Sequence, residues 1–380
     1  MRQVSFLGRL PDPFKRKDGT KITPSDWEKE RAAIRDFVVD HEYGGIPPRP
    51  ERVEAELLNY PSGRHTPFWY RITAYTEHGS LSFMLKLTVP EIKEYTNPDV
   101  LFIGDEYFPV VLTGDGCYDG MSKAVAEEAN RRGYVAASFN RLEICKDKRA
   151  IEPDFKSGGL HNLYPDYPDF SAISAWAWGY STVMDVFEKM PFINEKEVGI
   201  TGHSRGGKTV LLAAVCDERI KYVCPNNSGC HGAASYRTVV TGQGENDIRT
   251  ERLADMLDAF PSWMGKKLFA YRDREGDLPY DMHYFGALVA PRYYFQCEGM
   301  QDYWINPIGS RNNFFAVKRC YEYLGCENNA SAWFREGGHR HELPDYTEFM
   351  DFMDRMRNHL PPLDRWQTDP YPDVERNFEW

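Results

Sequence analysis

The sequence contains 380 residues with a formal net charge of −11, and 42% of its residues are hydrophobic. That apolar content can build one large core, and the acidic surplus argues against a nucleic acid partner. No uninterrupted apolar run reaches the roughly 18–20 residues that a membrane span needs. We therefore expect a globular domain that binds neither nucleic acid nor membrane.

The chain begins with a predicted helical lead-in over residues 1–50. A helix is expected at 26–44 with Ser25 as its N-cap, and a cluster of prolines ends it. Four strands are expected next, at 53–58, 69–77, 81–90 and 109–114.

After residue 120 the pattern changes to alternating helices and strands. Helices are expected at 123–133, 169–190, 206–217, 283–291, 314–325 and 346–359, and strands at 134–140, 197–204, 221–228, 292–299 and 331–338. Such alternation favours a mostly parallel sheet covered by helices on both faces, a three-layer α/β/α sandwich. We expect one α/β-hydrolase domain over 1–380, in which 232–282 forms an insertion or a cap over the active site.

Eight cysteines are spread at wide intervals along the chain. None forms a CxxC pair, which argues against a zinc ribbon. Several lie in apolar strand-like runs, where cysteine behaves as a small hydrophobic residue. One or two disulfides remain open if the protein is exported.

The pentapeptide Gly202-His203-Ser204-Arg205-Gly206 matches G-x-S-x-G. It follows an apolar strand and opens a helix, which is the context that a nucleophile elbow requires. The helix N-terminus directs N–H groups and a positive dipole end at a developing oxyanion. Ser204 is therefore the predicted nucleophile, and the backbone N–H of Arg205 is a predicted oxyanion donor.

The general base should lie in the loop after the last strand, where the sequence reads Gly337-Gly338-His339-Arg340-His341. His339 directly follows the glycine pair and is the predicted base. His341 is the alternative, or else stabilises the loop or contacts substrate. An H-x-H pair can also bind metal, but no third ligand stands at metal spacing, so we expect none.

The triad acid should follow the preceding strand, which reads YYFQCEGMQDYWINP. Asp302 lies in a turn beyond the strand end, where a carboxylate can orient the histidine Nδ1–H. Glu298, at the strand terminus, is the competing candidate. We favour Asp302.

Several motifs resemble the glucuronoyl esterases of carbohydrate esterase family 15, especially their bacterial branch. They are GHSRGGKTVLLAAVCDERI, NNSGCHGAASYR, PVVLTGDG, FNRLEI, DFSAISAWAWGYS, LPYDMHYFGALVAPR, DYWINP and GGHRH. The resemblance covers roughly residues 105–355, and S-R-x-G-K after the elbow is not general to α/β-hydrolases. It implies a serine carboxylester hydrolase that cleaves (4-O-methyl-)glucuronic acid esters in glucuronoxylan or lignin-carbohydrate complexes.

The resemblance also assigns roles to residues around the elbow. It implies that the Arg205 side chain helps to stabilise the oxyanion, that Lys208 contacts sugar hydroxyls and that Trp304 packs near the sugar. Glu245 and Glu251 match polar uronate contacts more loosely. Two cations beside a serine suit a hydroxyl-rich uronate ring. The alternative for Lys208 is an ion pair with Asp217 or Glu218 nearby.

The chain departs from the fungal members of that family at two positions. Asn227 stands where they carry a catalytic glutamate, and an amide cannot stabilise an imidazolium as a carboxylate does. Bacterial relatives can place the acid after the next strand instead, which is consistent with Asp302. His203 stands where the fungal members have a cysteine, so the fungal active-site disulfide is absent.

The expected reaction needs no cofactor and no metal, and the expected partner is a polysaccharide or a small uronate ester. We expect a monomer, although nothing in the sequence reports on oligomeric state. The substrate class implies a secreted or periplasmic protein, whereas residues 1–17 contain no apolar stretch of secretory length. An acetyl-xylan or feruloyl esterase, a peptidase of the prolyl oligopeptidase kind and a non-catalytic carbohydrate-binding relative are the alternatives.

Overall fold

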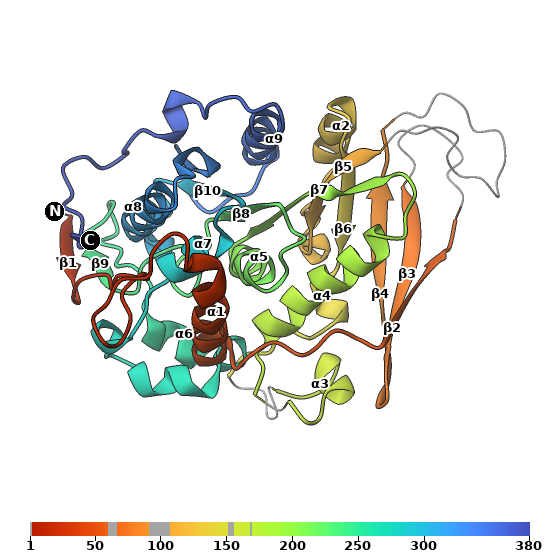
Figure 1. The fold of residues 1–380 in the computed structure, drawn as a ribbon, viewed down its shortest axis with the longest axis horizontal. Helices are drawn as coiled ribbons and strands as arrows, with labels where there is room; N and C mark the ends of the chain where they lie inside the picture. Colours follow the sequence, from red (N-terminus) through yellow and green to blue (C-terminus); the bar gives the residue numbers. More distant parts are fainter. Residues whose placement is uncertain (1, 60–66, 91–106, 151–155, 168) are drawn as a thin grey trace.

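A nine-stranded sheet forms the centre of the computed structural model, which describes residues 2–59, 67–90, 107–150, 156–167 and 169–380 (Figure 1). Its strand order is β11-β10-β8-β7-β5-β6-β4-β3-β2. The strands are β2 (Arg52–Leu57), β3 (Phe68–Thr76), β4 (Gly79–Thr88), β5 (Phe108–Thr113), β6 (Val135–Phe139), β7 (Ile193–His203), β8 (Tyr222–Asn226), β10 (Tyr293–Gly299) and β11 (Ala330–Arg335). Neighbouring strands run parallel along β6, β5, β7, β8, β10 and β11. At the other end of the sheet, β4, β3 and β2 are added by antiparallel pairing.

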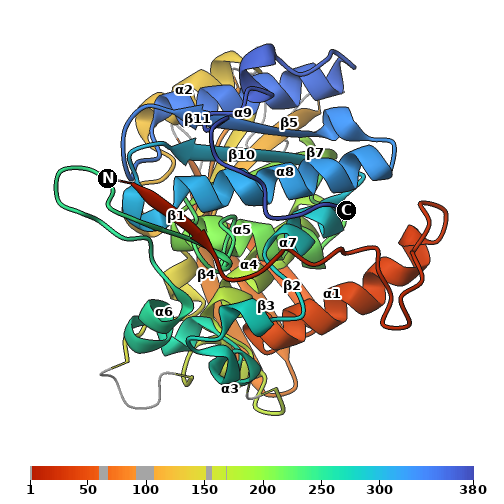
Figure 2. The ribbon, with the colours of Figure 1, turned by 90° about the vertical axis from the view of Figure 1, so that its left-hand side faces the viewer.

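Helices cover both faces of this sheet (Figure 2). They are α1 (Trp27–Tyr43), α2 (Lys123–Arg131), α3 (Leu160–Leu163), α4 (Ala172–Phe187), α5 (Arg205–Cys216), α6 (Leu253–Ala259), α7 (His283–Val289), α8 (Pro307–Tyr323) and α9 (Leu343–Arg357). Alternate strand residues enter two separate cores: Val110 and Leu112 pack with α4 and α5, whereas Val111 packs with α2 and α9. This arrangement confirms the predicted α/β-hydrolase sandwich.

The local predictions need one correction at the first helix. Ser25 does not cap it, because the helix begins at Trp27 and Asp26 occupies the N-cap position. The Asp26 carboxylate instead accepts a hydrogen bond from the Thr23 hydroxyl at 2.7 Å. The lead-in also holds a strand that the sequence did not suggest, β1 (Gln3–Phe6), which pairs antiparallel with β9 (Thr238–Thr241).

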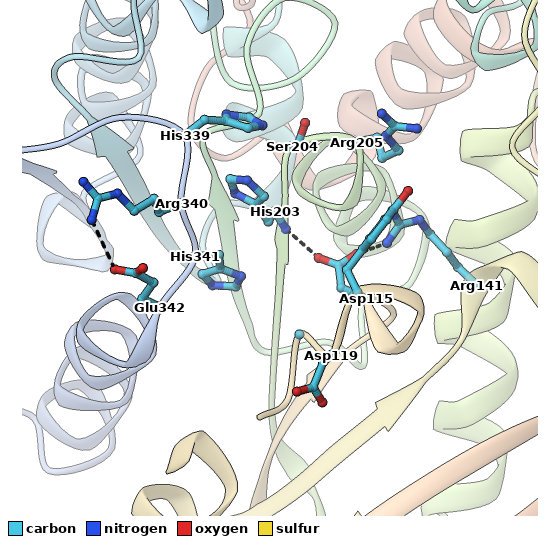
Figure 3. Close-up of a pocket in the computed structure, with 12 residues that line it drawn as sticks. Asp115, Asp119, Arg141, His203, Ser204, Arg205, His339, Arg340, His341 and Glu342 are labelled. Carbon is cyan, nitrogen blue, oxygen red and sulfur yellow. Dashed lines mark hydrogen bonds and ion pairs between the residues drawn. The ribbon is translucent and has the colours of Figure 1, made fainter. Parts of the chain in front are cut away.

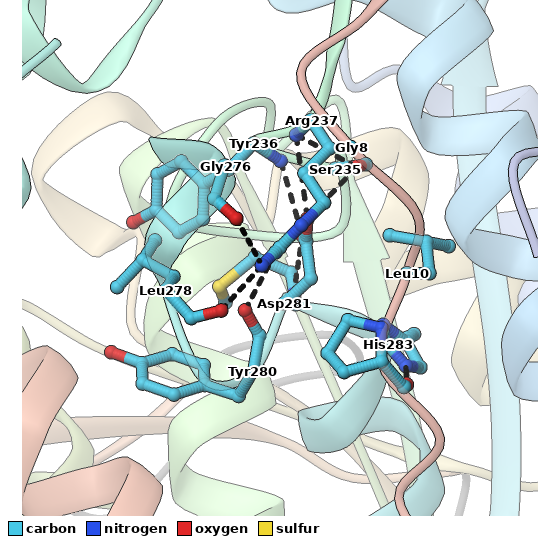
Figure 4. Close-up of polar contacts among 12 residues, drawn as sticks. Gly8, Leu10, Ser235, Tyr236, Arg237, Gly276, Leu278, Tyr280, Asp281 and His283 are labelled. Atoms are coloured by element: carbon cyan, nitrogen blue, oxygen red, sulfur yellow. Dashed lines mark hydrogen bonds and ion pairs between the residues drawn. The ribbon is translucent and has the colours of Figure 1, made fainter. Parts of the chain in front are cut away.

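The segment 232–282 leaves the strand–helix alternation and contains β9 and α6. A buried ion pair between Arg237 and Asp281, 3.1 Å apart, joins its two ends (Figure 4). Arg237 also donates to the carbonyl of Tyr280 at 2.8 Å, and the Ser235 hydroxyl donates to Asp281 at 3.0 Å. These bonds hold the start and the end of the segment together.

All eight cysteines lie in the described part of the chain, and all are unpaired thiols. Within the described ranges no helix combines the length and the apolar character needed to cross a membrane.

Candidate active site

The turn between β7 and α5 carries Ser204. Its backbone has φ 56° and ψ −119°, a left-handed conformation that a non-glycine residue adopts only when its surroundings impose it. The glycines around it leave room for this turn, because a Cβ on Gly202 would lie 2.5 Å from the carbonyl oxygen of Gly206. The predicted nucleophile elbow is therefore formed.

Gly206 faces a buried carboxylate that the sequence analysis did not single out. Asp115, at the end of β5, accepts the backbone N–H of His203 at 2.7 Å and forms an ion pair with the buried Arg141. A Cβ on Gly206 would lie 2.5 Å from Oδ2 of Asp115. Asp115 thus fixes the elbow through the backbone of His203 and by close contact with Gly206.

Replacing Gly206 with alanine should lower the free energy of unfolding by about 2 kcal/mol, because the new methyl group must displace a buried, paired carboxylate. Gly338→Ala is the matched control, since its Cβ would meet no atom within 4 Å. Urea unfolding of both variants checks this. Equal free energies of unfolding for the two variants would show that the Asp115 carboxylate can move aside without loss of stability.

His339 and Asp302 meet at the loop edge of the sheet. Nδ1 of His339 lies 2.6 Å from Oδ2 of Asp302, and the same oxygen accepts the Asn227 side-chain amide at 2.6 Å. Asn227 also accepts the backbone N–H of Gly299 at 3.2 Å. Asn227 therefore holds the carboxylate that contacts His339.

The loop that carries His339 is fixed by Arg335, at the end of β11. Its guanidinium pairs with Asp345 at 2.6 Å and donates to the backbone carbonyls of Gly338 at 3.3 Å and Arg340 at 2.6 Å. These carbonyls flank His339 on both sides. Both His339 and Ser204 line one cavity, and the His339 ring points toward Ser204 in Figure 3.

The other two histidines beside the elbow contact neighbouring rings, and Nδ1 of His203 also lies 2.6 Å from Oδ1 of Asn226. The His203 ring lies 4.2 Å from the His339 ring, and the His341 ring stacks on Tyr346 at the same distance. Burial lowers the pKa of His203 to about 4 and holds the pKa of His341 well below its ordinary value. Both rings are therefore neutral at pH 7. Within the described residues, no set of three His, Cys, Asp or Glu side chains is arranged to hold a metal ion.

Glu298, the competing acid, is fully buried on β10 and is engaged elsewhere. One of its oxygens accepts the Gln296 amide at 3.0 Å, and the other has no hydrogen-bond partner. Burial raises the pKa of the Glu298 carboxyl to about 8. A carboxyl that is mostly protonated at neutral pH is poorly suited to stabilise an imidazolium.

The raised pKa of Glu298 gives a stability prediction. An unfolded glutamate ionises near pH ~4.3, so the folded state binds this proton more tightly and loses stability as the pH rises from there to about 8. Glu298→Gln should therefore gain stability over the wild type as the pH rises from 5 to 8, measured by urea unfolding. Glu127→Gln, exposed on α2, should show no such gain. A difference that is independent of pH would contradict the assignment of Glu298 as a neutral buried acid.

Arg205 is the first residue of α5, where a backbone N–H has no partner within the helix. Its guanidinium forms an ion pair with Asp147 and lies 4.8 Å from the ring centre of Trp263. Arg205 lines the same cavity as Ser204. The residue thus offers both a backbone donor and a held cation beside Ser204.

Lys208 is almost fully buried and does not pair with the acids at 217 and 218. Its ammonium donates to the carbonyls of Ser228, at 2.5 Å, and Cys230, and lies 3.7 Å from Glu251. Burial raises the pKa of Glu251, and its Oε1 has no hydrogen-bond partner. A buried acceptor therefore remains available beside Lys208.

Trp304 adjoins this pair, because its backbone carbonyl accepts the N–H of Glu251 at 2.8 Å. Its side chain is 40% exposed, and the Arg249 guanidinium lies 5.2 Å from its ring centre. Glu245 is exposed on the loop between β9 and α6. The structure thus joins Lys208, Glu251 and Trp304, whereas it gives Glu245 no contact with them.

The cavity beside Ser204 has a volume of about 430 Å³ (Figure 3). Its walls are formed by Asp115, Tyr118, Asp119, Gly120, Arg141, His203, Ser204, Arg205, His339, Arg340, His341 and Glu342. Among these residues, Asp115, Tyr118, Asp119, Gly120 and Arg141 were not predicted from the sequence as part of the site. Two of the family-like motifs, PVVLTGDG and FNRLEI, contain Asp115 and Arg141 and were the available signal.

Comparison with known proteins identifies the family. The model of the fungal glucuronyl esterase family matches residues 72–325. A carbohydrate esterase, MZ0003, from an unknown prokaryotic organism is 32% identical over 401 aligned positions, covering 91% of this chain and 89% of the relative. The 4-O-methyl-glucuronoyl methylesterase 1 of Wolfiporia cocos is 29% identical over 339 residues, covering 88% of this chain and 76% of the relative.

A solved structure agrees with these matches. The family 15 glucuronoyl esterase from Caldicellulosiruptor kristjansonii superposes with a TM-score of 0.78 at 26% identity and covers 97% of both chains. The chain therefore belongs to the glucuronoyl esterases of carbohydrate esterase family 15.

Proposed function

We propose that this chain hydrolyses esters of 4-O-methylglucuronic acid, with Ser204 as nucleophile, His339 as general base and Asp302 as triad acid. The contact of 2.6 Å between His339 and Asp302, beside a serine in an elbow turn, carries the proposal. The names of the fungal relatives, 4-O-methyl-glucuronoyl methylesterases, support this substrate.

In the first half of the reaction, Ser204 attacks the uronate C6 carbonyl while His339 takes the hydroxyl proton. Asp302 keeps Nδ1 of His339 protonated, which leaves Nε2 free to accept that proton. The backbone N–H of Arg205 and its guanidinium stabilise the negative charge on the carbonyl oxygen. The C–O bond to the alcohol then breaks, and the alcohol leaves with the proton from His339.

In the second half, water hydrolyses the uronoyl ester of Ser204. His339 accepts a proton from the water, which attacks the same carbonyl carbon. The second tetrahedral intermediate collapses, Ser204 regains its proton from His339, and the uronic acid is released. Besides the ester and water, the steps use the side chains of Ser204, His339 and Asp302 and the donors of Arg205.

The acyl side of the site is assigned to Trp304, Glu251 and Lys208. The half-exposed indole offers a flat apolar surface for a sugar ring. Oε1 of Glu251 is a buried acceptor without a hydrogen-bond partner, 3.7 Å from the Lys208 ammonium, and suits a ring hydroxyl. Lys208 donates to two carbonyls, so it supports the loop 228–230 and has a third N–H beside Glu251. Glu245 remains a proposed contact that no observed neighbour supports.

A comparison of substrates tests the proposal. The wild-type protein should hydrolyse the methyl ester of 4-O-methylglucuronic acid at a kcat/KM at least tenfold above that for an O-acetylated xylose. Released acid is titrated at constant pH for both substrates. The reverse preference would leave Ser204 as an esterase nucleophile but overturn the uronate assignment. No hydrolysis of either ester would overturn the esterase function as well.

A further inference from the structure

The Arg205 side chain is held on two sides by groups that no step of the reaction uses directly. Asp147, whose side chain is 9% exposed, pairs with one end of the guanidinium. The rings of Phe260 and Trp263 lie with their centres 5.1 and 4.8 Å from the guanidinium carbon. A long and otherwise mobile side chain is thereby confined beside Ser204.

Trp263 also contacts Asp147. Its indole N–H donates to Oδ1 of Asp147 at 2.9 Å, while Oδ2 of the same carboxylate accepts from Arg205. The three side chains therefore form a closed triangle of one ion pair, one hydrogen bond and one cation–ring contact. Each of the three fixes the other two.

The triangle is anchored in a buried polar cluster. Nε2 of His231 lies 3.1 Å from the backbone carbonyl of Trp263, and Nδ1 of His231 contacts Glu42 at the end of α1. Glu42 also accepts the hydroxyls of Tyr236 and of Tyr280, the latter at 2.6 Å. Glu42 and His231 have no exposed surface. The position of the Trp263 backbone is thus determined by the lead-in helix.

We propose that Asp147 and Trp263 are positioning residues that fix the Arg205 guanidinium for stabilisation of the oxyanion. This inference rests on the proposed function. A guanidinium has five N–H donors in a planar fork, and Asp147 engages it at Nη1. Because this contact and the rings of Phe260 and Trp263 restrict the guanidinium, its orientation is limited beside the cavity that Ser204 and Arg205 share. Stabilisation of a transition state depends on such preorganisation, because a donor that must reorient loses most of its benefit.

The first test is Asp147→Asn, which keeps the shape of the side chain but removes its charge. We expect kcat for the methyl ester of 4-O-methylglucuronic acid to fall by about tenfold or more while KM changes less than about twofold. The matched control is Asp185→Asn, which removes the charge from another largely buried aspartate, paired with Arg219 at 2.7 Å. The control should leave kcat unchanged. Equal losses of kcat in both variants would overturn the assignment.

A double-mutant cycle separates positioning from general damage. In an Arg205→Ala background, Asp147→Asn should have almost no further effect on kcat, because there is no guanidinium left to position. Trp263→Phe keeps a ring but loses the N–H bond to Asp147, and it should lower kcat by about threefold only when Arg205 is present. Additive losses in the Arg205→Ala background would show that both residues act independently of Arg205, and would overturn the proposal.

Activity of the wild type separates a failure of the proposed function from a failure of the positioning roles of Asp147 and Trp263. If the wild type hydrolyses the ester and the losses are additive, only the positioning roles fail. If the wild type hydrolyses no uronate ester, the proposed function fails and the positioning roles are overturned with it.

Discussion

Replacing Ser204 with alanine will lower kcat for uronate ester hydrolysis by about 10⁶-fold, because the variant lacks the atom that attacks the carbonyl. The fold should persist, since the backbone N–H of Ser204 still donates to the carbonyl of Asn226 at 2.9 Å. The variant should still bind the ester. Progress curves measure the turnover, and calorimetry measures the binding.

Ser122→Ala is the control for this substitution. Ser122 caps α2 by accepting the N–H of Val125 at 3.4 Å and is not one of the residues that line the cavity. Losing the cap should cost about 1 kcal/mol of stability and leave kcat unchanged. If Ser204→Ala retained more than about a thousandth of the wild-type rate, the nucleophile would have to be another group.

Replacing Asp302 with asparagine will lower kcat by about 10⁴-fold. Asp302 contacts Nδ1 of His339 at 2.6 Å, and an amide there can favour the wrong tautomer and cannot stabilise the imidazolium. Progress curves at saturating ester measure the loss. Oδ2 of Asp302 also accepts the Asn227 amide, and the variant keeps that bond only if the oxygen of the new amide, rather than its NH₂ group, takes the Oδ2 position.

Glu298→Gln distinguishes the two candidate acids. Glu298 is bonded to Gln296 and its raised pKa keeps it mostly neutral, so glutamine should preserve kcat within about threefold at pH 7. A larger loss in Glu298→Gln than in Asp302→Asn would reverse the assignment of the acid.

The elbow and the histidine loop could be predicted from the sequence because their signals are local. Ser204 stands between an apolar strand and a helix, and His339 follows a glycine pair after the last strand. The acid was harder to assign, since Asp302 and Glu298 are four residues apart at the end of the same strand. What separates them is the direction in which the chain turns after Gly299, and that direction depends on neighbours such as Asn227.

Other parts of the site depend on contacts between distant parts of the chain. Asp115 meets the elbow 88 residues away, and the ends of the Arg205–Asp147 pair are 58 residues apart. Lys208 could be predicted as a cation near the serine, but its burial follows from the loop 228–230 that folds over it. The pairing of β1 with β9 joins segments more than 230 residues apart, and neither strand has a strong periodic signal.

The proposed mechanism requires a covalent uronoyl ester of Ser204, and transesterification tests this most directly. The wild-type protein is given the benzyl ester of glucuronic acid in the presence of increasing methanol, and the products are separated by chromatography. We expect the methyl ester of glucuronic acid to form beside the free acid, with a ratio of ester to acid that rises linearly with methanol concentration, because both nucleophiles attack one acyl-enzyme. Release of benzyl alcohol with free acid as the sole acyl product at every methanol concentration would contradict the covalent intermediate.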